Sequence, residues 1–280
     1  MRVMVIGATG LLGQALTREW TEDEVAALGS KDVDIRSDTG VESAIRQYLP
    51  DWIVLAAAYT DVDGCETNRD LAFEVNTAGA IRVARSASAV GARLLFLSTD
   101  YVFDGRKATP YEIDDPLAPQ CVYGESKARA EVGIREVLPE SCILRTSWVF
   151  GTGGKCFPET ILKLAETRRE LDVVMDQGGC PTYTVDLARA IIQLCRKHAT
   201  GTIHATNQNA CSWFDFATEI VQGVGLATVV RPTTSDKFVR PAKRPAYSVL
   251  SSASLDRYAV TMPTWQDALH RYLVERRRPA

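Results

Sequence analysis

Tyr123 and Lys127 are the two residues whose types and spacing point most directly to chemistry. If the segment around them forms a helix, side chains four residues apart lie on one face, and the phenol and the ammonium can reach the same ligand. A phenol has a reference pKa of about 10, and a nearby ammonium stabilises the phenolate, which makes the phenol a usable proton donor. A solvated surface pair would have the same spacing, so the interpretation depends on the surrounding elements.

Glycines near the start of the chain give a second sign of a ligand site. Residues 2–6 read as a short apolar strand, and Gly7, Gly10 and Gly13 separate it from a helical pattern. Glycines in such a turn let the chain bend sharply and let a diphosphate approach the backbone amides. The N-terminus of the following helix then faces the phosphates with its partial positive charge. We therefore predict a dinucleotide site here, with a tight turn that binds no ligand as the alternative.

The elements that must position these residues follow from an alternation of apolar runs and helical patterns. This alternation predicts an α/β fold with a Rossmann-like, doubly wound parallel sheet in residues 1–150 and a smaller α/β substrate lobe in 151–280. We expect some crossing of the chain between the two lobes. Ligands of such sheets bind at the carboxyl ends of the strands. The loops expected there are 57–60, after the third strand, and 98–100, after the fourth.

Two further segments invite a function. Residues 240–245 form a basic, proline-bounded stretch that could clamp a diphosphate, and a solvated linker is the alternative. The length and prolines of residues 101–119 fit a lid over a substrate.

The composition is that of an ordinary globular chain and excludes several classes of function. Of the 280 residues, 46% are hydrophobic and 24% are charged, and the net charge of -3 gives no field that would attract nucleic acid or an anionic membrane. The seven cysteines are odd in number and never in a Cys-x-x-Cys spacing, so we expect reduced thiols in a cytoplasmic protein. His198, His204 and His270 have no metal-ligand spacing. We expect no signal peptide and no membrane span.

With these residues in hand, the chain resembles the extended short-chain dehydrogenase/reductase superfamily and, within it, the dTDP-4-dehydrorhamnose reductase family. The resemblance runs nearly end to end. It is carried by residues 57–63, 98–105, 123–127, 145–151, 176–183 and 240–245. It implies an enzyme that uses NADPH or NADH to reduce the C4 ketone of dTDP-4-dehydro-L-rhamnose, giving dTDP-L-rhamnose as the last step of dTDP-rhamnose synthesis.

The resemblance also implies a catalytic triad of Thr99, Tyr123 and Lys127. Tyr123 would donate a proton to the alkoxide that develops at C4, and Thr99 would hydrogen-bond the same oxygen. Lys127 would hold the nicotinamide ribose and keep the phenol acidic.

Further site residues follow from the same resemblance. Those implied at the cofactor are Gly7, Gly10, Leu11, Leu12, Gly13, Asp34, Ile35, Ala58, Tyr59, Thr60, Tyr123 and Lys127. Within this set, residues 10–12 would meet the diphosphate, 34–35 the adenine side and 58–60 the nicotinamide half. Thr99, Asp100, Tyr123 and Trp148 would contact the substrate. Asp34 could instead cap a helix, and Trp148 could instead be a core aromatic residue.

Departures from the family pattern bear on the cofactor, the metal and the dimer. In some relatives a carboxylate of the first helix helps to bind magnesium between subunits; Ala15 stands at that position here, so both the Mg²⁺ and a homodimer are left open, and we predict no metal ligands. No carboxylate ends the second strand, where NAD-specific folds place one. Ser30 and Lys31 stand there instead and could accept a 2′-phosphate, which favours NADPH over NADH.

Three alternatives remain at this stage. A sugar-nucleotide dehydratase or epimerase shares the fold, but dehydratases follow the threonine with Asp-Glu, and Tyr101 follows Asp100 here. A related nucleotide 4-keto-6-deoxysugar reductase would carry the same residues. A non-catalytic, NADP-binding regulatory subunit like that of methionine adenosyltransferase is the third, and the segments at 145–148 and 176–183 favour the reductase over it.

Overall fold

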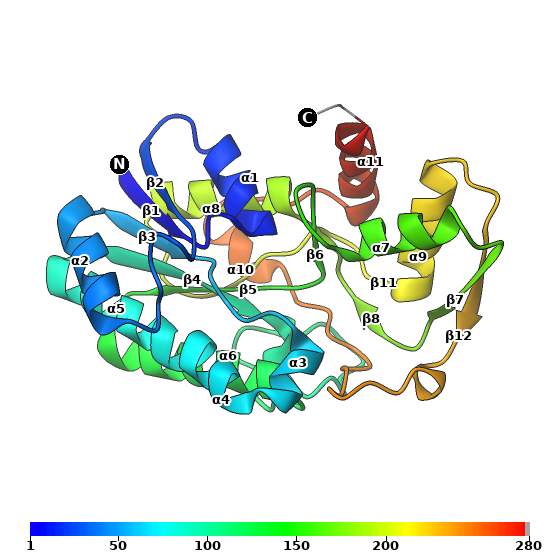
Figure 1. The fold of residues 1–280 in the computed structure, drawn as a ribbon, viewed down its shortest axis with the longest axis horizontal. Helices are drawn as coiled ribbons and strands as arrows, with labels where there is room; N and C mark the ends of the chain where they lie inside the picture. Colours follow the sequence, from blue (N-terminus) through cyan, green and yellow to red (C-terminus); the bar gives the residue numbers. More distant parts are fainter. Residues whose placement is uncertain (278–280) are drawn as a thin grey trace.

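The computed structural model describes residues 1–277 and is built around one six-stranded parallel sheet (Figure 1). Its spatial order is β10-β5-β4-β3-β1-β2. The strands are β1 (Arg2–Ile6), β2 (Glu24–Leu28), β3 (Trp52–Leu55), β4 (Arg93–Thr99), β5 (Cys142–Thr146) and β10 (Gly201–His204). The strand order reverses direction beside β1, so the predicted doubly wound α/β fold is confirmed.

Helices cover both faces of the sheet because its strands are apolar on both sides. On one face α1 (Leu11–Glu19) and α8 (Thr184–Arg196) pack over the sheet, with Leu16 and Ile191 fully buried. On the other face lie α2 (Asp38–Tyr48), α5 (Ala80–Val90) and α6 (Val122–Val137). The short elements α3 (Val62–Thr67), α4 (Arg69–Phe73), the π-helix η1 (Glu74–Gly79) and the 3₁₀ turn η2 (Asp100–Val102) complete this part of the chain.

A second, smaller cluster of elements lies beside the sheet and has its own aromatic core (Figure 1). Phe150, Phe216 and Tyr272 are buried there at 0% exposure. The elements are β6 (Val149–Phe150), α7 (Phe157–Ala165), β7 (Glu170–Val174), β8 (Gly178–Gly179), β9 (Thr182–Tyr183), β11 (Cys211–Ser212), α9 (Trp213–Gly223), β12 (Val229–Thr233), η3 (Ser235–Lys237) and α11 (Trp265–Arg276). These elements form the smaller lobe.

The chain passes between the two lobes more than once. After the first elements of the smaller lobe, α8 and β10 return to the large sheet, and α10 (Ala253–Asp256) packs against β10. A cut at residue 150 would therefore remove the edge strand of the sheet. We propose a spatial division into a nucleotide lobe and a substrate lobe in which residues 184–205 count with the nucleotide lobe.

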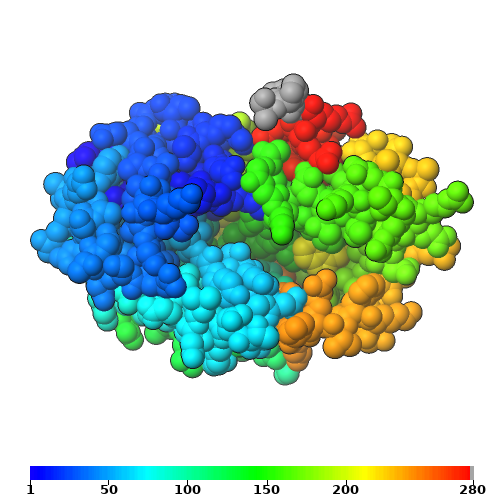
Figure 2. Space-filling model, viewed as in Figure 1, coloured from blue at the N-terminus to red at the C-terminus, as the bar shows by residue number. Residues whose placement is uncertain are grey.

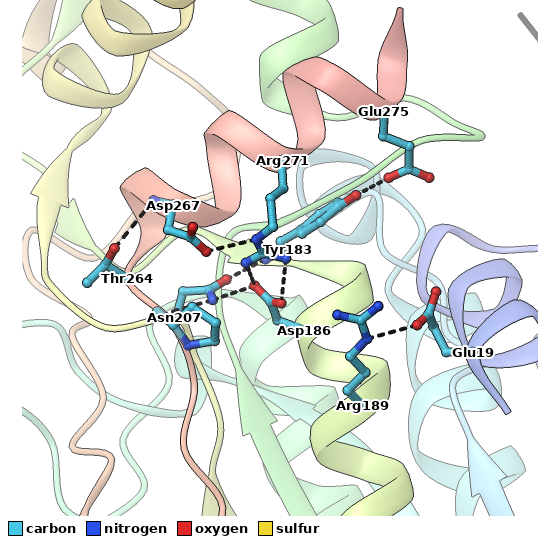
Figure 3. Close-up of polar contacts among 10 residues, drawn as sticks. Glu19, Tyr183, Asp186, Arg189, Asn207, Thr264, Asp267, Arg271 and Glu275 are labelled. Carbon is cyan, nitrogen blue, oxygen red and sulfur yellow. Dashed lines mark hydrogen bonds and ion pairs between the residues drawn. The ribbon is translucent and has the colours of Figure 1, made fainter. Parts of the chain in front are cut away.

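A buried polar network joins the lobes where α8 meets α11 (Figure 3). The Asp186 carboxylate, 4% exposed, accepts two hydrogen bonds from Arg271 at 2.8 and 2.7 Å and one from Asn207 at 2.8 Å. Asn207 also accepts the Tyr183 amide at 2.8 Å. A buried carboxylate with three donors is satisfied, so this network fixes α11 to the nucleotide lobe.

The segment predicted as a lid packs against the C-terminal part of the chain. Phe103 and Tyr111 are buried and stacked, with ring centroids 4.3 Å apart. The Tyr111 amide donates to the carbonyl of Val249, and its carbonyl accepts from the amide of Ser251. A lid movement of residues 101–119 would have to break these contacts. Among the described residues, no helix has the length and apolar character needed to cross a membrane.

Candidate active site

Helix α6 brings the predicted proton donor and its lysine to the carboxyl end of β4. Cys121 is the N-cap of the helix, and Tyr123 and Lys127 lie one turn apart on the face toward the sheet. Gly124 allows this approach, because a Cβ there would lie 2.1 Å from the carbonyl oxygen of Tyr101. The sequence therefore needs a glycine after Tyr123 for η2 to pack on the helix.

Two of the three predicted catalytic side chains, Thr99 and Tyr123, lie within hydrogen-bonding reach, and Lys127 follows one helical turn after Tyr123. Thr99 is the last residue of β4 and is 5% exposed, while Tyr123 is half-buried. Burial raises the pKa of the Tyr123 phenol above its ordinary value, and a hydrogen bond with Thr99 opposes that rise. The sequence led us to expect a phenol made more acidic by Lys127, whereas burial here gives the opposite direction; the raised pKa keeps the phenol protonated in this state.

Lys127 is almost fully enclosed, at 2% exposure, with its ammonium 4.0 Å from the centroid of the Phe96 ring. Burial lowers the pKa of Lys127 to about 7, and the charge of Glu131 opposes that change. An ammonium poised near neutral pH can both donate a hydrogen bond to a ribose hydroxyl and stabilise a phenolate.

Asp100 lies at the centre of this site and is 1% exposed. Its Oδ1 accepts the Thr99 hydroxyl at 3.0 Å, whereas its Oδ2 has no partner among the described residues. Burial raises the pKa of Asp100 to about 6. An unpartnered buried carboxylate oxygen is costly and is common at functional sites, so a hydroxyl-bearing ligand would satisfy it.

Replacing Asp100 should change the pH dependence of stability in a defined direction. Because the folded-state pKa exceeds the ordinary value, ionisation of the Asp100 carboxyl destabilises the folded state. This destabilisation grows as the pH rises and is complete above about pH 6. When the pH is raised from 4 to 7.5, the free energy of unfolding of Asp100→Asn should increase by about 2–3 kcal/mol relative to that of wild type, since each pKa unit corresponds to about 1.4 kcal/mol. Urea unfolding at the two pH values measures this difference.

The matched control has the opposite sign. Tyr111 donates to Asp104 and lowers the pKa of Asp104, so that carboxylate stabilises the fold at neutral pH and loses this effect as the pH falls. Asp104→Asn should therefore lose stability at pH 7.5. Equal effects of both substitutions at both pH values would contradict the raised pKa of the Asp100 carboxyl.

The glycine turn after β1 has the geometry of a diphosphate cradle. Gly7 has a φ of 98°, and a Cβ at Gly13 would lie 2.1 Å from the Gly7 carbonyl oxygen, so α1 can approach β1 only with glycine there. Gly10 is the N-cap of α1 and supplies no side-chain cap, which leaves the first helical amides for a ligand. Leu11 and Leu12 open the helix and are half-buried. These residues fit the diphosphate of a dinucleotide.

The residues predicted for the nicotinamide half lie in the loop after β3. Ala58 and Tyr59 are half-buried and Thr60 is exposed. Asn76, buried in the π-helix η1, accepts the Tyr59 amide at 2.7 Å and donates to the Tyr59 carbonyl and to Ser126 of α6. The loop is therefore fixed to the catalytic helix, and a π-helix at such a place is common at functional sites.

Of the two residues predicted at the adenine side, Ile35 is buried beneath Gly79 and Asp34 is exposed. Asp34 pairs with Arg36, which lowers the pKa of Asp34 to about 2. The alternative that Asp34 caps a helix is wrong, because Ser37 is the N-cap of α2 and accepts the Gly40 amide. Asp34 remains a predicted adenine contact.

The sequence analysis expects no carboxylate at the end of β2, and the structure differs from this expectation in one detail. The Asp32 carboxylate does reach this end, but it accepts the Gly29 amide at 2.8 Å and so closes the turn. A Cβ at Gly29 would lie 2.8 Å from Thr9 of the glycine turn, so the exposed Ser30 and Lys31 stand close to the cradle.

Trp148 has an aromatic partner that sequence reasoning missed. Its ring stacks on that of Trp213, with centroids 3.4 Å apart and planes 7° apart, and its backbone has a φ of 46°. A Cβ at Gly179 would lie 2.4 Å from the same ring. Trp148 is thus held in a strained conformation between β8 and α9, which is characteristic of functional positions.

The basic segment 240–245 contacts the nucleotide lobe. Asp63 of α3 accepts hydrogen bonds from Arg240 and from the Ala242 amide, and it pairs with Arg244 at 2.9 Å. Arg244 also donates to the Tyr101 hydroxyl at 3.3 Å, and Tyr101 packs edge-on to Tyr123. The alternative of a solvated linker is therefore wrong for Arg244, whose side chain is 18% exposed.

Figure 2 shows a recess between the blue and cyan half and the green and orange half of this face.

The described residues contain no group of three or more His, Cys, Asp or Glu side chains able to hold a metal ion. Ala15, at the position where some relatives carry a carboxylate, is buried against α8. A pocket of about 1190 Å³ lies between α1, α8 and α11, and none of the predicted catalytic or substrate residues lines it.

Asn76, Trp213 and Glu131 have functional surroundings that the sequence analysis did not find. The sequences around Asn76 and Glu131 have the pattern of ordinary helices and do not indicate a functional site. Trp213 follows a strand of only two residues. The short spacing of Glu131 from Lys127 was the one available signal, since it is the same four-residue step that joins Tyr123 to Lys127.

A doubly wound sheet with a glycine turn before α1 and a Tyr/Lys pair on α6 defines a dinucleotide-dependent enzyme of the short-chain dehydrogenase/reductase class. The pattern of the RmlD substrate binding domain family matches residues 1–278. The chain belongs to this family, which is that of the dTDP-4-dehydrorhamnose reductases.

Individual relatives agree with this assignment. The chain is similar to the spore coat polysaccharide biosynthesis protein SpsK of Bacillus subtilis strain 168, with 44% identity over 98% of each chain. It is 40% identical to a dTDP-4-dehydrorhamnose reductase of Mycobacterium tuberculosis, over 96% of this chain and 91% of that protein. The crystal structure of the Bacillus anthracis dTDP-4-dehydrorhamnose reductase in complex with NADP superposes with a TM-score of 0.96 at 37% identity, over 98% and 99% of the two chains.

Proposed function

We propose that the protein reduces the C4 ketone of dTDP-4-dehydro-L-rhamnose to dTDP-L-rhamnose, the last step of dTDP-rhamnose synthesis. The observation that supports the proposal is the hydrogen bond between Thr99, which ends β4, and Tyr123, which precedes Lys127 by one turn of α6, within a family of reductases named for this step. NADPH, when bound, supplies the hydride that C4 receives.

The side chains have separate tasks in this reaction. Tyr123 gives its phenolic proton to the C4 oxygen, and Thr99 donates a hydrogen bond to that oxygen as its charge develops. Lys127 holds the nicotinamide ribose and stabilises the phenolate that remains. The unpartnered Asp100 Oδ2 accepts a sugar hydroxyl, and Trp148 presents its ring to the deoxysugar.

The diphosphate of the sugar nucleotide has a candidate partner in Arg244. Asp63 holds this guanidinium near Tyr101 and so keeps it oriented toward the catalytic side of the cleft. The same contacts argue against a dehydratase, because Tyr101 occupies the position where a dehydratase carries its second carboxylate, and its hydroxyl is bonded to Arg244.

Product analysis tests the reaction itself. The protein is incubated with NADPH and the 4-keto-6-deoxy substrate, and the sugar nucleotide formed is identified by NMR. dTDP-L-rhamnose as the sole product supports the proposal, and the 4-epimeric 6-deoxytalose product would move the assignment to a related nucleotide 4-keto-6-deoxysugar reductase. Binding of NADPH without turnover of any keto-sugar would favour the regulatory-subunit alternative.

Cofactor preference should depend on Lys31. A charge-assisted hydrogen bond to a 2′-phosphate contributes about 1.5 kcal/mol, so we expect Lys31→Ala to lower the kcat/KM for NADPH relative to NADH about 10-fold. Steady-state rates with both cofactors measure this ratio. The control is Lys163→Ala, an exposed lysine of α7, which should leave the ratio unchanged. An unchanged ratio in Lys31→Ala would assign NADPH preference to other residues.

We further propose that the enzyme works in the cytoplasm with its thiols reduced, since all seven cysteines are free and six of them are buried. Magnesium and the homodimer are addressed by two measurements. Activity before and after EDTA treatment tests the metal requirement, and sedimentation with and without Mg²⁺ tests the dimer.

A further inference from the structure

A buried ion pair outside the catalytic triad lies directly beneath it. Glu131 of α6 and Arg145 of β5 are 1% and 3% exposed, and their nearest charged atoms are 2.7 Å apart. The Arg145 guanidinium donates three hydrogen bonds to the two carboxylate oxygens of Glu131. Taking two charges out of water costs several kcal/mol each, and a hydrophobic pair of the same volume is often as stable. Stability alone therefore gives no reason for these charges.

The carboxylate of Glu131 joins α6 and β4, which carry the catalytic groups, to the neighbouring strand β5. It accepts the hydroxyl of Ser98, the residue before Thr99 in β4. It accepts Arg145, which stands opposite Ser98 in the register between β4 and β5. Glu131 itself lies on α6, four residues after Lys127 and so one turn beneath it.

The surroundings of Arg145 hold the pair in one orientation. Its Nη1 donates to the Ile113 carbonyl at 3.2 Å and contacts Nε2 of His204 at 3.3 Å. Burial lowers the pKa of His204 to about 3, so this imidazole is neutral and can accept the hydrogen bond at Nε2. The guanidinium also lies over the Phe103 ring.

We propose that Glu131 is a positioning residue of the reductase site: its carboxylate fixes α6 to the ends of β4 and β5 and places one negative charge beneath the Lys127 ammonium. The first effect keeps Tyr123 and Lys127 aligned with Thr99. The second favours the charged form of Lys127 although the side chain is enclosed, so that it can stabilise the phenolate after proton transfer.

The other charged and titratable groups near the site act on residues other than Lys127. Burial is the main influence on the pKa of Lys127, and Glu131 is the charge that opposes it. Cys65 of α3 and Asp100 and Tyr101 of η2 act on Tyr123. From η1, Asn76 and Thr77 contribute neutral hydrogen bonds to Ser126, and from α4, Arg69 pairs with the partly exposed Glu125.

The test measures the ionisation of Lys127 directly. In protein labelled with ¹³C at lysine Cε, the Lys127 resonance is assigned by its loss in Lys127→Met and followed from pH 5 to pH 10. An opposite charge nearby favours the charged form of a lysine, so Glu131→Gln should lower the titration midpoint, by about 1 pKa unit. At pH 7.5 its kcat should fall about 10-fold, and its alkaline limb should move to lower pH.

Three further variants separate the two effects from a simple loss of fold. Glu131→Gln combined with Arg145→Gln leaves no unpaired buried charge, and its Lys127 midpoint should still lie below that of wild type. Ser98→Ala breaks the contact to β4 and keeps the charge, so its kcat should fall severalfold with the midpoint unchanged. Glu125→Gln, on the outer side of the same helix, should change neither quantity.

The inference rests on the proposed function only for the kinetic measurement. If wild type turns over no keto-sugar, the proposed function fails, while the NMR titration still decides the role of the Glu131 charge. A Lys127 midpoint that stays at its wild-type value in both Glu131 variants overturns that role. Wild-type kcat in Ser98→Ala and in the double variant would overturn the positioning role.

Discussion

Tyr123→Phe should lower kcat for keto-sugar reduction about 10²–10⁴-fold, the usual contribution of a placed general acid. The substitution removes the phenolic proton and keeps the ring, whose edge-on contact with Tyr101 remains. Helix α6 and Lys127 are unchanged, so NADPH should bind with an affinity close to that of wild type. Absorbance assays of NADPH oxidation, with the substrate generated in the same tube, measure the rate, and fluorescence titration measures binding.

Tyr48→Phe is the matched control for this prediction. Tyr48 ends α2 and donates to the Glu24 carbonyl far from the cleft, so its loss should leave kcat near the wild-type value. A Tyr123→Phe enzyme with a wild-type rate would move the proton donor to another group. Loss of NADPH binding in the same variant would instead indicate a damaged cofactor site.

The second large effect concerns stability, at the carboxylate that joins α8 to α11 (Figure 3). Arg271→Met leaves the buried Asp186 charge without its ion-pair partner. Removing one partner of a buried pair costs about 3–5 kcal/mol, and we expect about 3 because the Arg271 side chain is 32% exposed. At about 2–4 °C per kcal/mol, the value for chains of about 150–250 residues, the melting temperature should fall by about 6–12 °C. Thermal unfolding followed by circular dichroism measures the change.

Two companion variants identify the cause of that loss. Adding Asp186→Asn removes the stranded charge and keeps a partner for Asn207, so the double variant should be more stable than Arg271→Met alone. Asp267→Asn removes the exposed partner of Arg271 and should cost less than about 1 kcal/mol. Additive losses in the double variant would show that packing of Arg271, and not the buried charge, stabilises this junction.

Local patterns made the sheet and the catalytic helix predictable. Alternating apolar runs and helical patterns are set by residues one to four positions apart, and the turn after β1 is specified by three glycines within seven residues. The Tyr123–Lys127 pair depends on one turn of one helix. The sequence by itself therefore determined the fold class, and it located the glycine turn and the Tyr123–Lys127 pair that we propose as the dinucleotide cradle and as the proton donor with its lysine.

Contacts between distant segments were decided by the tertiary structure alone. Arg240 meets Asp63 across 177 residues, and Arg145 meets Glu131 because β5 lies beside β4 while α6 packs above both. The Trp148 ring contacts Trp213 and Gly179, which come from two separate elements. Such contacts depend on strand order, register and the direction in which side chains leave each element, none of which a local pattern contains. The same reason hid the return of β10 to the large sheet, since an apolar strand of four residues fits either lobe until its neighbours are known.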